Sequence, residues 1–425
     1  MVRSGDLPLG WKSRKILPTD HSLIMRRPSI FSSEDARIPA QKRLPRIIFD
    51  FIEGAAGREM ASRRNQSRFD DILLQPRAMA DIGSRTLTTR FLGRDYALPL
   101  GIAPMGMCNL AHPRADRQIA QAAVDWQMPV CLSSAGSSGL VDMLRWSDGL
   151  AWFQLYFGQS SEVSFQTVDR AHAAGYETLI LTVDVPEVSR RIRDQRNGFG
   201  LPFRLTPQSL LDFAQHPRWA LSTLLHGVPA PQNFASSGKS FDRTASRAGA
   251  DWHFLQALRD RWPGKLIVKG ITSPEDALKV RSLGVDAIYV SNHGGRQLDS
   301  APAAIDLLPI IRRAVGPSYP LLFDSGVRNG DDVVKAIALG ADFVMIGRPV
   351  LYALGAAGGA GLKSLLQCFA QDIDLTMAQI GIARIEDIDT RALFSAVPQA
   401  ASGDTLLGPR TLATALRPLQ EPARK

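Results

Sequence analysis

The sequence predicts an α/β protein, a closed (β/α)8 TIM barrel with an N-terminal helical segment and a long loop after strand 4. Eight short apolar runs lie between residues 99 and 347, and each is typical of a buried strand. They are PLGIA (99–103), MPVCLS (128–133), LAWFQLY (150–156), ETLILTVD (177–184), KLIVKG (265–270), DAIYVSN (286–292), PLLFDSG (320–326) and ADFVMIG (341–347). Helical spacing between most of them indicates βαβ units, and eight units close into a barrel. An open doubly wound sheet is the alternative, but no GxGxxG fingerprint follows the first run.

Helix signals stand between and around these strands. Helical spacing is found in HPRADRQIAQAAVDWQ (112–127), SPEDALKVRSLG (273–284) and NGDDVVKAIALG (329–340), and the last two begin with a capping Ser or Asn and end with Gly. RLPRIIFDFIEGAA (43–56) predicts one amphipathic helix before the barrel, and SLLQCFAQDIDLTMAQIG (364–381) predicts a final helix. We therefore expect an irregular basic extension over 1–40, the barrel domain over 41–396 and a loose tail over 397–425.

The net charge of +9 is carried by the two ends of the chain. Residues 1–46 hold 10 Lys+Arg against 4 Asp+Glu, and residues 405–425 hold 4 against 1, so the totals of 50 and 41 leave 36 of each sign between them. A neutral body argues against a nucleic-acid partner. The basic ends are either simply solvated or attracted to an anionic membrane surface.

Composition and cysteine usage restrict the class of protein. With 45% hydrophobic and 21% charged residues, the chain is neither disordered nor a disulfide scaffold. The start of the sequence lacks the apolar region of a secretory signal. Cys108, Cys131 and Cys368 show neither CxxC nor zinc spacing, so we expect buried thiols, a reducing compartment and no metal site. These features predict a cytoplasmic enzyme, either free or peripheral on the inner face of the cell membrane.

The loop after the fourth strand is unusually long. Asp184 and Lys269 are 85 residues apart, whereas Gln154 and Thr182, in the preceding unit, are 28 apart. Long loops on this side of a barrel are usually lids or binding segments. The stretch LTPQSLLDFAQHPRWALSTLLHGVP (205–229) has many apolar residues and few charges. It predicts either a lid helix or a membrane contact, which would extend over 205–235.

Polar residues end six successive strands, at the end of the barrel where active sites form. In strand order they are Gln154 and Tyr156; Thr182 and Asp184; Lys269; Ser291, His293 and Arg296; Asp324 and Arg328; and Gly347 and Arg348. A purely structural rim does not require this set. The set predicts a site that holds a cofactor and an acid–base group.

The chemistry of each of these residues suggests a separate role in the site. Gly326 and Gly347 allow close backbone approach, and Arg328 and Arg348 add charge-assisted bonds, which predicts a phosphate site after strands seven and eight. A central Lys269 can stabilise negative charge on a flavin ring. His293 is the natural general base because its ordinary pKa lies near neutrality. Asp184 can orient it, and Arg296 can bind a carboxylate with two hydrogen bonds.

The motif SNHGGRQLD, with LTVD, LIVKG, DSGVRNG and IGRP in order, resembles the FMN-dependent L-2-hydroxy acid oxidase/dehydrogenase family. That family includes glycolate oxidase, quinone-type L-lactate dehydrogenase and mandelate dehydrogenase, and the resemblance runs from about Gln41 to Asp389. It implies FMN at the carboxyl ends of the strands and a homotetramer of barrels. It also implies that a 2-hydroxy acid is the substrate.

The resemblance also implies individual roles. His293 would be the base with Asp184 as its partner, and Tyr156 would contact the substrate hydroxyl or the developing charge. Substrate binding would involve Arg296, Arg191, Tyr156 and the position of Phe51. FMN would be held by Pro104, Met105, Gly106, Ser133, Gln154, Thr182, Lys269, Ser291, Asp324, Gly326, Arg328, Gly347 and Arg348.

Three positions depart from the family pattern. The usual YDY-type motif is FDF here, so Phe51 stands where a Tyr hydroxyl would meet the substrate carboxylate. The loss of such a hydrogen bond costs about 1.5–3 kcal/mol. Ala135 replaces an aromatic residue of glycolate-oxidase-like members, which leaves room for a bulkier substrate. Gly106 ends the flavin loop, as in dehydrogenase and monooxygenase members.

These features favour FMN-dependent oxidation of an L-2-hydroxy acid to the 2-oxo acid, with a quinone-type electron acceptor. An oxygen-using oxidase that produces hydrogen peroxide is the alternative. A non-oxidative flavin barrel enzyme, a barrel that keeps FMN without catalysis, and a membrane-docking scaffold are further alternatives. The intact His-Gly-Gly-Arg signature argues against the first of these.

Overall fold

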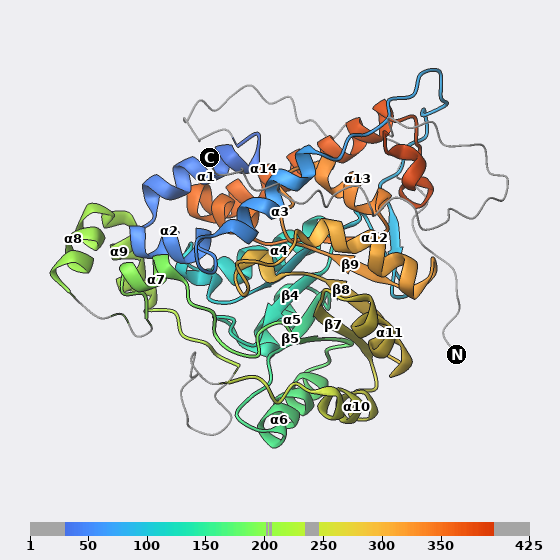
Figure 1. The fold of residues 1–425 in the computed structure, drawn as a ribbon. Helices are drawn as coiled ribbons and strands as arrows, with labels where there is room; N and C mark the ends of the chain where they lie inside the picture. Colours follow the sequence, from blue (N-terminus) through green and yellow to red (C-terminus); the bar gives the residue numbers. More distant parts are fainter. Residues whose placement is uncertain (1–29, 201–202, 204–205, 234–245, 395–425) are drawn as a thin grey trace, which may run out of the picture.

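Eight parallel strands form a closed barrel in the order β10-β3-β4-β5-β6-β7-β8-β9, which confirms the predicted architecture (Figure 1). The computed structural model describes residues 30–200, 203, 206–233 and 246–394. The strands are β3 (Leu100–Met105), β4 (Val130–Ser133), β5 (Ala151–Leu155), β6 (Thr178–Thr182), β7 (Lys265–Ile271), β8 (Ala287–Val290), β9 (Leu321–Phe323) and β10 (Phe343–Ile346). Each of the eight apolar runs in the sequence therefore overlaps one barrel strand, and β3 and β7 extend beyond the carboxyl ends of their runs.

One helix or more follows each strand and covers the outside of the barrel. These helices are α4 (Ala115–Asp125), α5 (Leu140–Trp146), α6 (Ser161–Ala173), α10 (Trp252–Arg261), α11 (Pro274–Ser282), α12 (Ala304–Val315), α13 (Gly330–Ala338) and α14 (Arg348–Gln379). The predicted caps are present: Ser273 accepts a hydrogen bond from Asp276 N, and Asn329 accepts one from Asp332 N. The final helix starts earlier than predicted and is kinked at Ala357 and Gly358.

The amino-terminal end of the barrel is closed by a short hairpin. Strands β1 (Thr89–Phe91) and β2 (Arg94–Tyr96) pair antiparallel, and Phe91 and Tyr96 pack on Phe343 at the start of β10. The same rings join a buried cluster with Trp152 of β5 inside the barrel. Aromatic rings therefore fill the interior of the barrel at this end, opposite the carboxyl ends where the predicted site residues lie.

The segment before the barrel is more helical than the sequence predicts. Helix α1 (Ser33–Arg43) is capped by Ser32, whose side chain accepts a hydrogen bond from Asp35 N. The prediction of an irregular extension is therefore wrong for residues 33–40. The single helix expected over 43–56 is instead α2 (Arg46–Glu53), separated from α1 by Pro45. Helix α1 packs along α14, and α3 (Met60–Asp70) packs on the turn His293–Gly295 that follows β8. Residues 1–29 and the predicted tail 397–425 lie outside the described residues.

In its described residues, the long loop after β6 carries the helices α7 (Ile192–Arg196), α8 (Pro207–Gln215) and α9 (Pro217–His226). Figure 1 shows α8 and α9 at the left edge of the molecule, beside α2. The carboxylate of Asp212 in α8 accepts hydrogen bonds from the backbone N–H groups of Arg46 and Ile47, which ties the loop to the start of α2. None of the helices in the described ranges has the length and apolar character needed to cross a membrane.

Candidate active site

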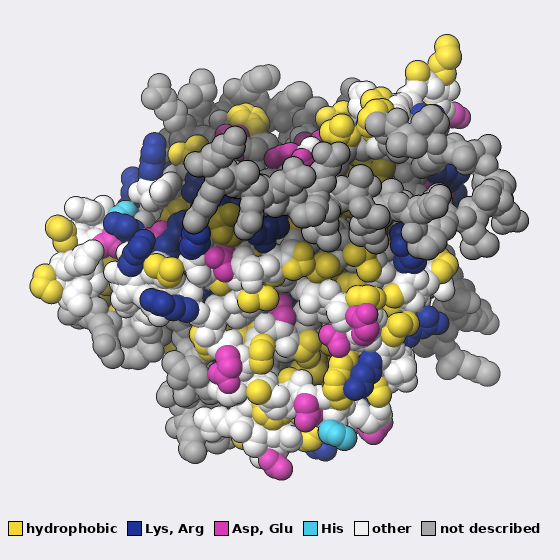
Figure 2. Space-filling view, in the orientation of Figure 1, with side chains coloured by type: hydrophobic (Ala, Val, Ile, Leu, Met, Phe, Trp, Pro, Cys, Tyr) yellow, Lys and Arg dark blue, Asp and Glu magenta, His cyan; other side chains and the backbone are white. Residues whose placement is uncertain are grey.

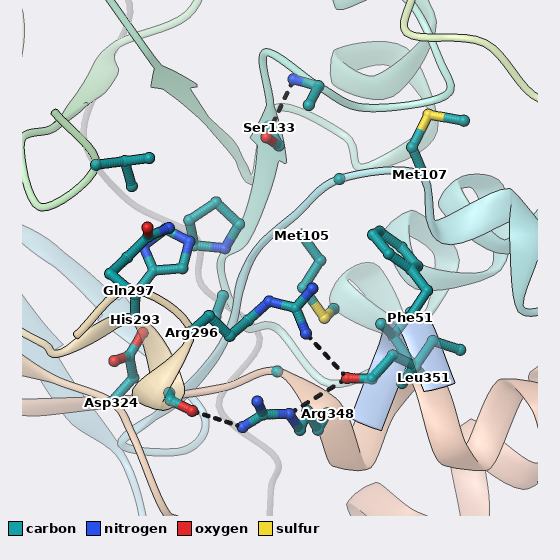
Figure 3. Close-up of a pocket in the computed structure, with 18 of the residues that line it drawn as sticks. Phe51, Met105, Met107, Ser133, His293, Arg296, Gln297, Asp324, Arg348 and Leu351 are labelled. Carbon is teal, nitrogen blue, oxygen red and sulfur yellow. Dashed lines mark hydrogen bonds between the residues drawn. The ribbon is translucent and has the colours of Figure 1, made fainter. Parts of the chain in front are cut away.

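A cavity of about 480 Å³ opens at the carboxyl ends of the barrel strands (Figure 3). The predicted site residues that line it are Phe51, Pro104, Met105, Gly106, Ser133, Tyr156, Arg191, Lys269, His293, Arg296, Asp324, Gly326, Arg328, Gly347 and Arg348. Gln154, Asp184 and Ser291 stand behind this wall and contact residues that form it, and Thr182 contacts Gln154. The structure thus brings the predicted set together around one space.

Two neighbours hold the imidazole of His293. Its Nδ1 lies 2.9 Å from Asp184 Oδ1, and its Nε2 lies 3.3 Å from Tyr156 Oη. Burial lowers the pKa of His293 below its ordinary value, although the charge of Asp184 opposes this shift. Burial would raise the pKa of Asp184, but its interaction with the protonated form of His293 and with the charge of Lys269 lowers it on balance. The arrangement is a neutral imidazole oriented by an ionised carboxylate.

The backbone around His293 explains the two glycines of its motif. His293, Gly294 and Gly295 all have positive φ, at 58°, 63° and 76°. A Cβ on Gly295 would lie 2.4 Å from Ser62 N, because α3 packs directly on this turn. Asn292 fixes the turn by accepting a hydrogen bond from Gly295 N. The left-handed turn therefore aims the imidazole into the cavity and holds it there.

Lys269 supplies a permanent positive charge at the floor of the cavity. Its Nζ donates to Ser291 Oγ at 2.8 Å and lies 3.7 Å from Asp324 Oδ2 and 3.9 Å from Asp184 Oδ2. Burial would lower the pKa of Lys269, but the charges of Asp324 and Asp184 raise it on balance. The side chain is only 4% exposed, so its charge acts in a region with little water.

Several observations fit FMN in this cavity. Ser133 donates to Gln154 Oε1, and Gln154 Nε2 donates to Thr182 Oγ1, so a fixed row of polar groups lies behind the flavin position. Gly347 is open toward the cavity, because a Cβ there would meet nothing closer than Met105 Sδ at 3.7 Å. Together with the cationic Lys269, this donor set suits an electron-poor ring with a phosphate tail. Within the described residues, no group of three His, Cys, Asp or Glu side chains is placed to hold a metal ion.

Helix packing requires a glycine at position 326, a reason that the sequence analysis did not predict. Its φ is 106°, and a Cβ would lie 2.1 Å from Asn65 O in α3. The packing of α3 against the end of β9 therefore requires this glycine, in addition to its place in the cavity wall.

Two arginines converge on the carboxyl end of α2. Arg296 Nη1 donates to Gly54 O at 2.7 Å, and Arg348 Nη2 donates to the same oxygen at 3.1 Å (Figure 3). Both arginines also reach Ile52 O at 3.3 Å. Since a helix carboxyl end carries partial negative charge, it positions both guanidinium groups beside the cavity.

Phe51 takes part in an aromatic stack. Its ring lies 4.2 Å from that of Phe199, nearly parallel at 8°, and the guanidinium of Arg296 lies 5.4 Å from its centroid. The stack positions Arg296 through packing and charge instead of through a hydroxyl. Apolar side chains of the long loop, such as Val188 and Val228, extend this wall of the cavity.

Sequence reasoning missed some cavity residues. Phe199, Arg247, Gln297 and Leu351 all line the space. Phe199 and Arg247 come from the long loop, where no strand marks which residues point inward. Gln297 directly follows Arg296 in the motif SNHGGRQLD, and this position was the one sequence signal that it could line the cavity. Its Oε1 is buried and, among the described residues, has no hydrogen-bond partner.

Comparison with known proteins identifies relatives over most of the chain. A family model described as FMN-dependent dehydrogenase matches residues 40–395. (S)-Mandelate dehydrogenase of Pseudomonas putida is 38% identical over 391 residues, covering 90% of this chain and 99% of the relative. L-Lactate dehydrogenase of Pseudomonas syringae is 37% identical over 383 residues, covering 87% and 99%. The crystal structure of the monotopic membrane protein (S)-mandelate dehydrogenase has a TM-score of 0.82 at 39% identity and covers 86% of this chain and 99% of that chain.

Proposed function

Because this chain belongs to the FMN-dependent dehydrogenase family, whose members named above act on 2-hydroxy acids, we propose that it oxidises an L-2-hydroxy acid with a bulky side chain to the 2-oxo acid and passes the electrons to a quinone at a membrane surface. The observation that carries the proposal is the His293–Asp184 pair at 2.9 Å, which faces a cavity with cationic and apolar walls. Oxygen as the acceptor is the alternative.

The proposed mechanism assigns one task to each group. Arg296 and Arg191 bind the substrate carboxylate, and they orient its 2-carbon toward His293. His293 Nε2 accepts a proton, and Asp184 stabilises the imidazolium that results. Tyr156 Oη donates a hydrogen bond to the substrate oxygen. FMN, when bound, supplies the two-electron acceptor. Lys269 Nζ provides the positive charge that favours this electron transfer.

The walls of the cavity support a substrate larger than lactate. Ala135 lines the cavity, and its methyl side chain takes up less of this space than an aromatic residue would. Phe51, Phe199 and Val228 form an apolar surface next to the arginines. An aromatic or branched side chain buries more apolar area there than a methyl group does. Turnover measured with acids from lactate to mandelate, with a quinone and with oxygen, tests both parts of the proposal. A preference for lactate would contradict the substrate class, and faster turnover with oxygen would contradict the quinone.

Replacing Phe51 by Tyr should improve the binding of the acid. The new hydroxyl can donate to the substrate carboxylate, and such a bond is worth about 1.5–3 kcal/mol, which corresponds to a KM at least about tenfold lower. Steady-state kinetics with the best acid of the panel measures this change. An unchanged KM would show that the substrate carboxylate does not lie beside residue 51.

The exposed apolar side chains of α8 and α9 support membrane contact. Leu224 is 81% exposed and Leu225 is 75% exposed, and Leu210, Leu211 and Leu221 lie on the same two helices. Figure 2 shows hydrophobic atoms at this left edge of the molecule. The solved mandelate dehydrogenase is itself described as monotopic, so we propose peripheral attachment through this pair of helices at the inner face of the cell membrane. A homotetramer remains a prediction, which light scattering would test.

Replacing Leu224 and Leu225 together by Asp should weaken binding to vesicles of phosphatidylglycerol and phosphatidylethanolamine. Each buried Leu is worth about 1.5–3 kcal/mol, so we expect a loss of at least about a hundredfold. Co-sedimentation measures it. Leu278→Asp is the matched control, because Leu278 is 48% exposed but lies on α11. Equal binding by the double variant and the wild type would contradict attachment through α9.

A further inference from the structure

The long loop after β6 returns to the active site at residue Arg247. Arg247 lines the cavity and is only 8% exposed. Its backbone N–H donates to Pro186 O at 2.8 Å, two residues after Asp184. The returning segment is therefore joined to the strand end that carries the partner of His293.

The guanidinium of Arg247 lies over the ring of Tyr156, with its Cζ 5.1 Å from the ring centroid. This contact depends on Gly249. A Cβ on Gly249 would lie 2.3 Å from two atoms of the Phe157 ring, so only glycine lets the segment approach Tyr156 and Phe157 this closely. The local chain thus holds a buried cation against the aromatic ring whose hydroxyl lies 3.3 Å from His293 Nε2.

We propose that Arg247 is a positioning residue that acts through Tyr156 in the reaction proposed above. A cation over the ring stabilises negative charge on the phenol oxygen, which makes the hydroxyl a stronger hydrogen-bond donor. Tyr156 can then stabilise the negative charge that develops on the substrate oxygen as His293 removes a proton. The inference rests on the proposed function for its kinetic consequences, but the Arg247–Tyr156 contact itself does not.

Other charges also face Tyr156, so the contribution of Arg247 must be isolated from theirs. Burial raises the pKa of Tyr156, Lys269 lowers it, Asp184 raises it, and Arg247 and Arg191 lower it further. Among the described residues, His293 also contacts the hydroxyl of Tyr156. Removing the charge of Arg247 should therefore raise the pKa of Tyr156 while the other charges stay in place.

The test is anaerobic flavin bleaching by a 2-hydroxy acid in Arg247→Met, in Tyr156→Phe and in the double variant. A cation–π contact of 0.5–2 kcal/mol corresponds to a loss of about 2- to 30-fold in the limiting rate constant of Arg247→Met, with little change in the acid concentration at half saturation. In the Tyr156→Phe background the same substitution should change the rate by less than about twofold. Arg247→Lys keeps a cation and should recover part of the loss.

Two further variants separate this role from simple stabilisation. Gly249→Ala keeps Arg247 but forces the segment away from Phe157, so it should reproduce the rate loss. Arg261→Met is the matched control, because Arg261 lies 5.3 Å from the Phe165 ring centroid, between α10 and α6 and away from the cavity. It should leave the bleaching rate unchanged.

A titration gives a readout that does not depend on turnover. The phenolate absorbance of the wild type minus that of Tyr156→Phe reports Tyr156, and Arg247→Met should move this transition to higher pH. Three results would overturn the proposal. Arg247→Met could lower the rate constant equally in the wild-type and Tyr156→Phe backgrounds, it could change only the acid concentration at half saturation, or it could leave the phenolate transition where it is. If no acid bleaches the wild-type flavin, the proposed function fails, while the phenolate titration still tests the Arg247–Tyr156 coupling.

Discussion

Replacing His293 by Asn should lower the rate constant of flavin bleaching by about 10²- to 10⁴-fold, the range for the loss of a general base. Asn is the suitable replacement because it tolerates the positive φ of 58° at this position better than most residues do. FMN should remain bound, because the proposed mechanism uses His293 as a base and not to hold FMN. Stopped-flow absorbance measures the rate, and the visible spectrum of the purified variant confirms FMN. Bleaching at the wild-type rate would remove His293 from the mechanism.

The same base predicts the direction of the pH dependence. Burial lowers the pKa of His293 below its ordinary value of 6.5, so bleaching should increase with pH through a transition below that value. Asp184→Asn removes the charge that raises this pKa, so the transition should move to still lower pH. Movement to higher pH in that variant would contradict the assigned pair.

Replacing Arg296 by Met should lower kcat/KM by about 30- to 5000-fold, because loss of one partner of a desolvated charge pair costs about 2–5 kcal/mol. Most of the effect should be in KM if the arginine holds the acid in the ground and transition states alike. Arg296→Lys keeps the positive charge but lacks the planar guanidinium group, so its kcat/KM should lie between those of the wild type and Arg296→Met.

The structural role of Arg296 is separable from its proposed binding role. Arg348 donates to Gly54 O and Ile52 O as well, so the end of α2 stays held when Arg296 is removed. The thermal unfolding temperature of the FMN-loaded variant should therefore change little. A large fall in that temperature together with an unchanged KM would show that Arg296 acts on the fold and not on the substrate.

The barrel could be predicted from the sequence because each strand is a short apolar run with polar residues at one end. The same pattern placed His293, Lys269 and Asp324 around one cavity, since parallel strands bring their carboxyl ends together. The pairing of His293 with Asp184 was predicted in the same way, whereas the contact of Tyr156 with His293 was not. Asp184 and Tyr156 follow neighbouring strands, and the structure places both within hydrogen-bonding reach of His293.

Helix α1 could not be predicted because it lacks a broad apolar stripe. Its buried residues are small, Ser33, Ala36 and Ala40, and the Ala40 methyl faces Gly355 of α14. This close approach depends on a partner more than 300 residues away in the chain. Pro39 inside the helix also argues against helix on local grounds.

The contributions of the long loop were unpredictable for a related reason. Phe199 stacks on Phe51, and Arg247 lies over Tyr156, but neither residue belongs to a periodic element. Their placement depends on tertiary contacts, such as the bond of Arg247 N to Pro186 O and the close approach of Gly249 to Phe157. No local pattern encodes such contacts.

The most direct test of the account is the visible spectrum of the purified, FMN-loaded protein under anaerobic conditions, recorded during addition of L- and D-enantiomers of 2-hydroxy acids from lactate to mandelate. The account predicts bleaching of the flavin by L-acids with bulky side chains, and slow recovery when air is admitted. A yellow protein that no L-2-hydroxy acid bleaches would contradict the proposed reaction at its central step.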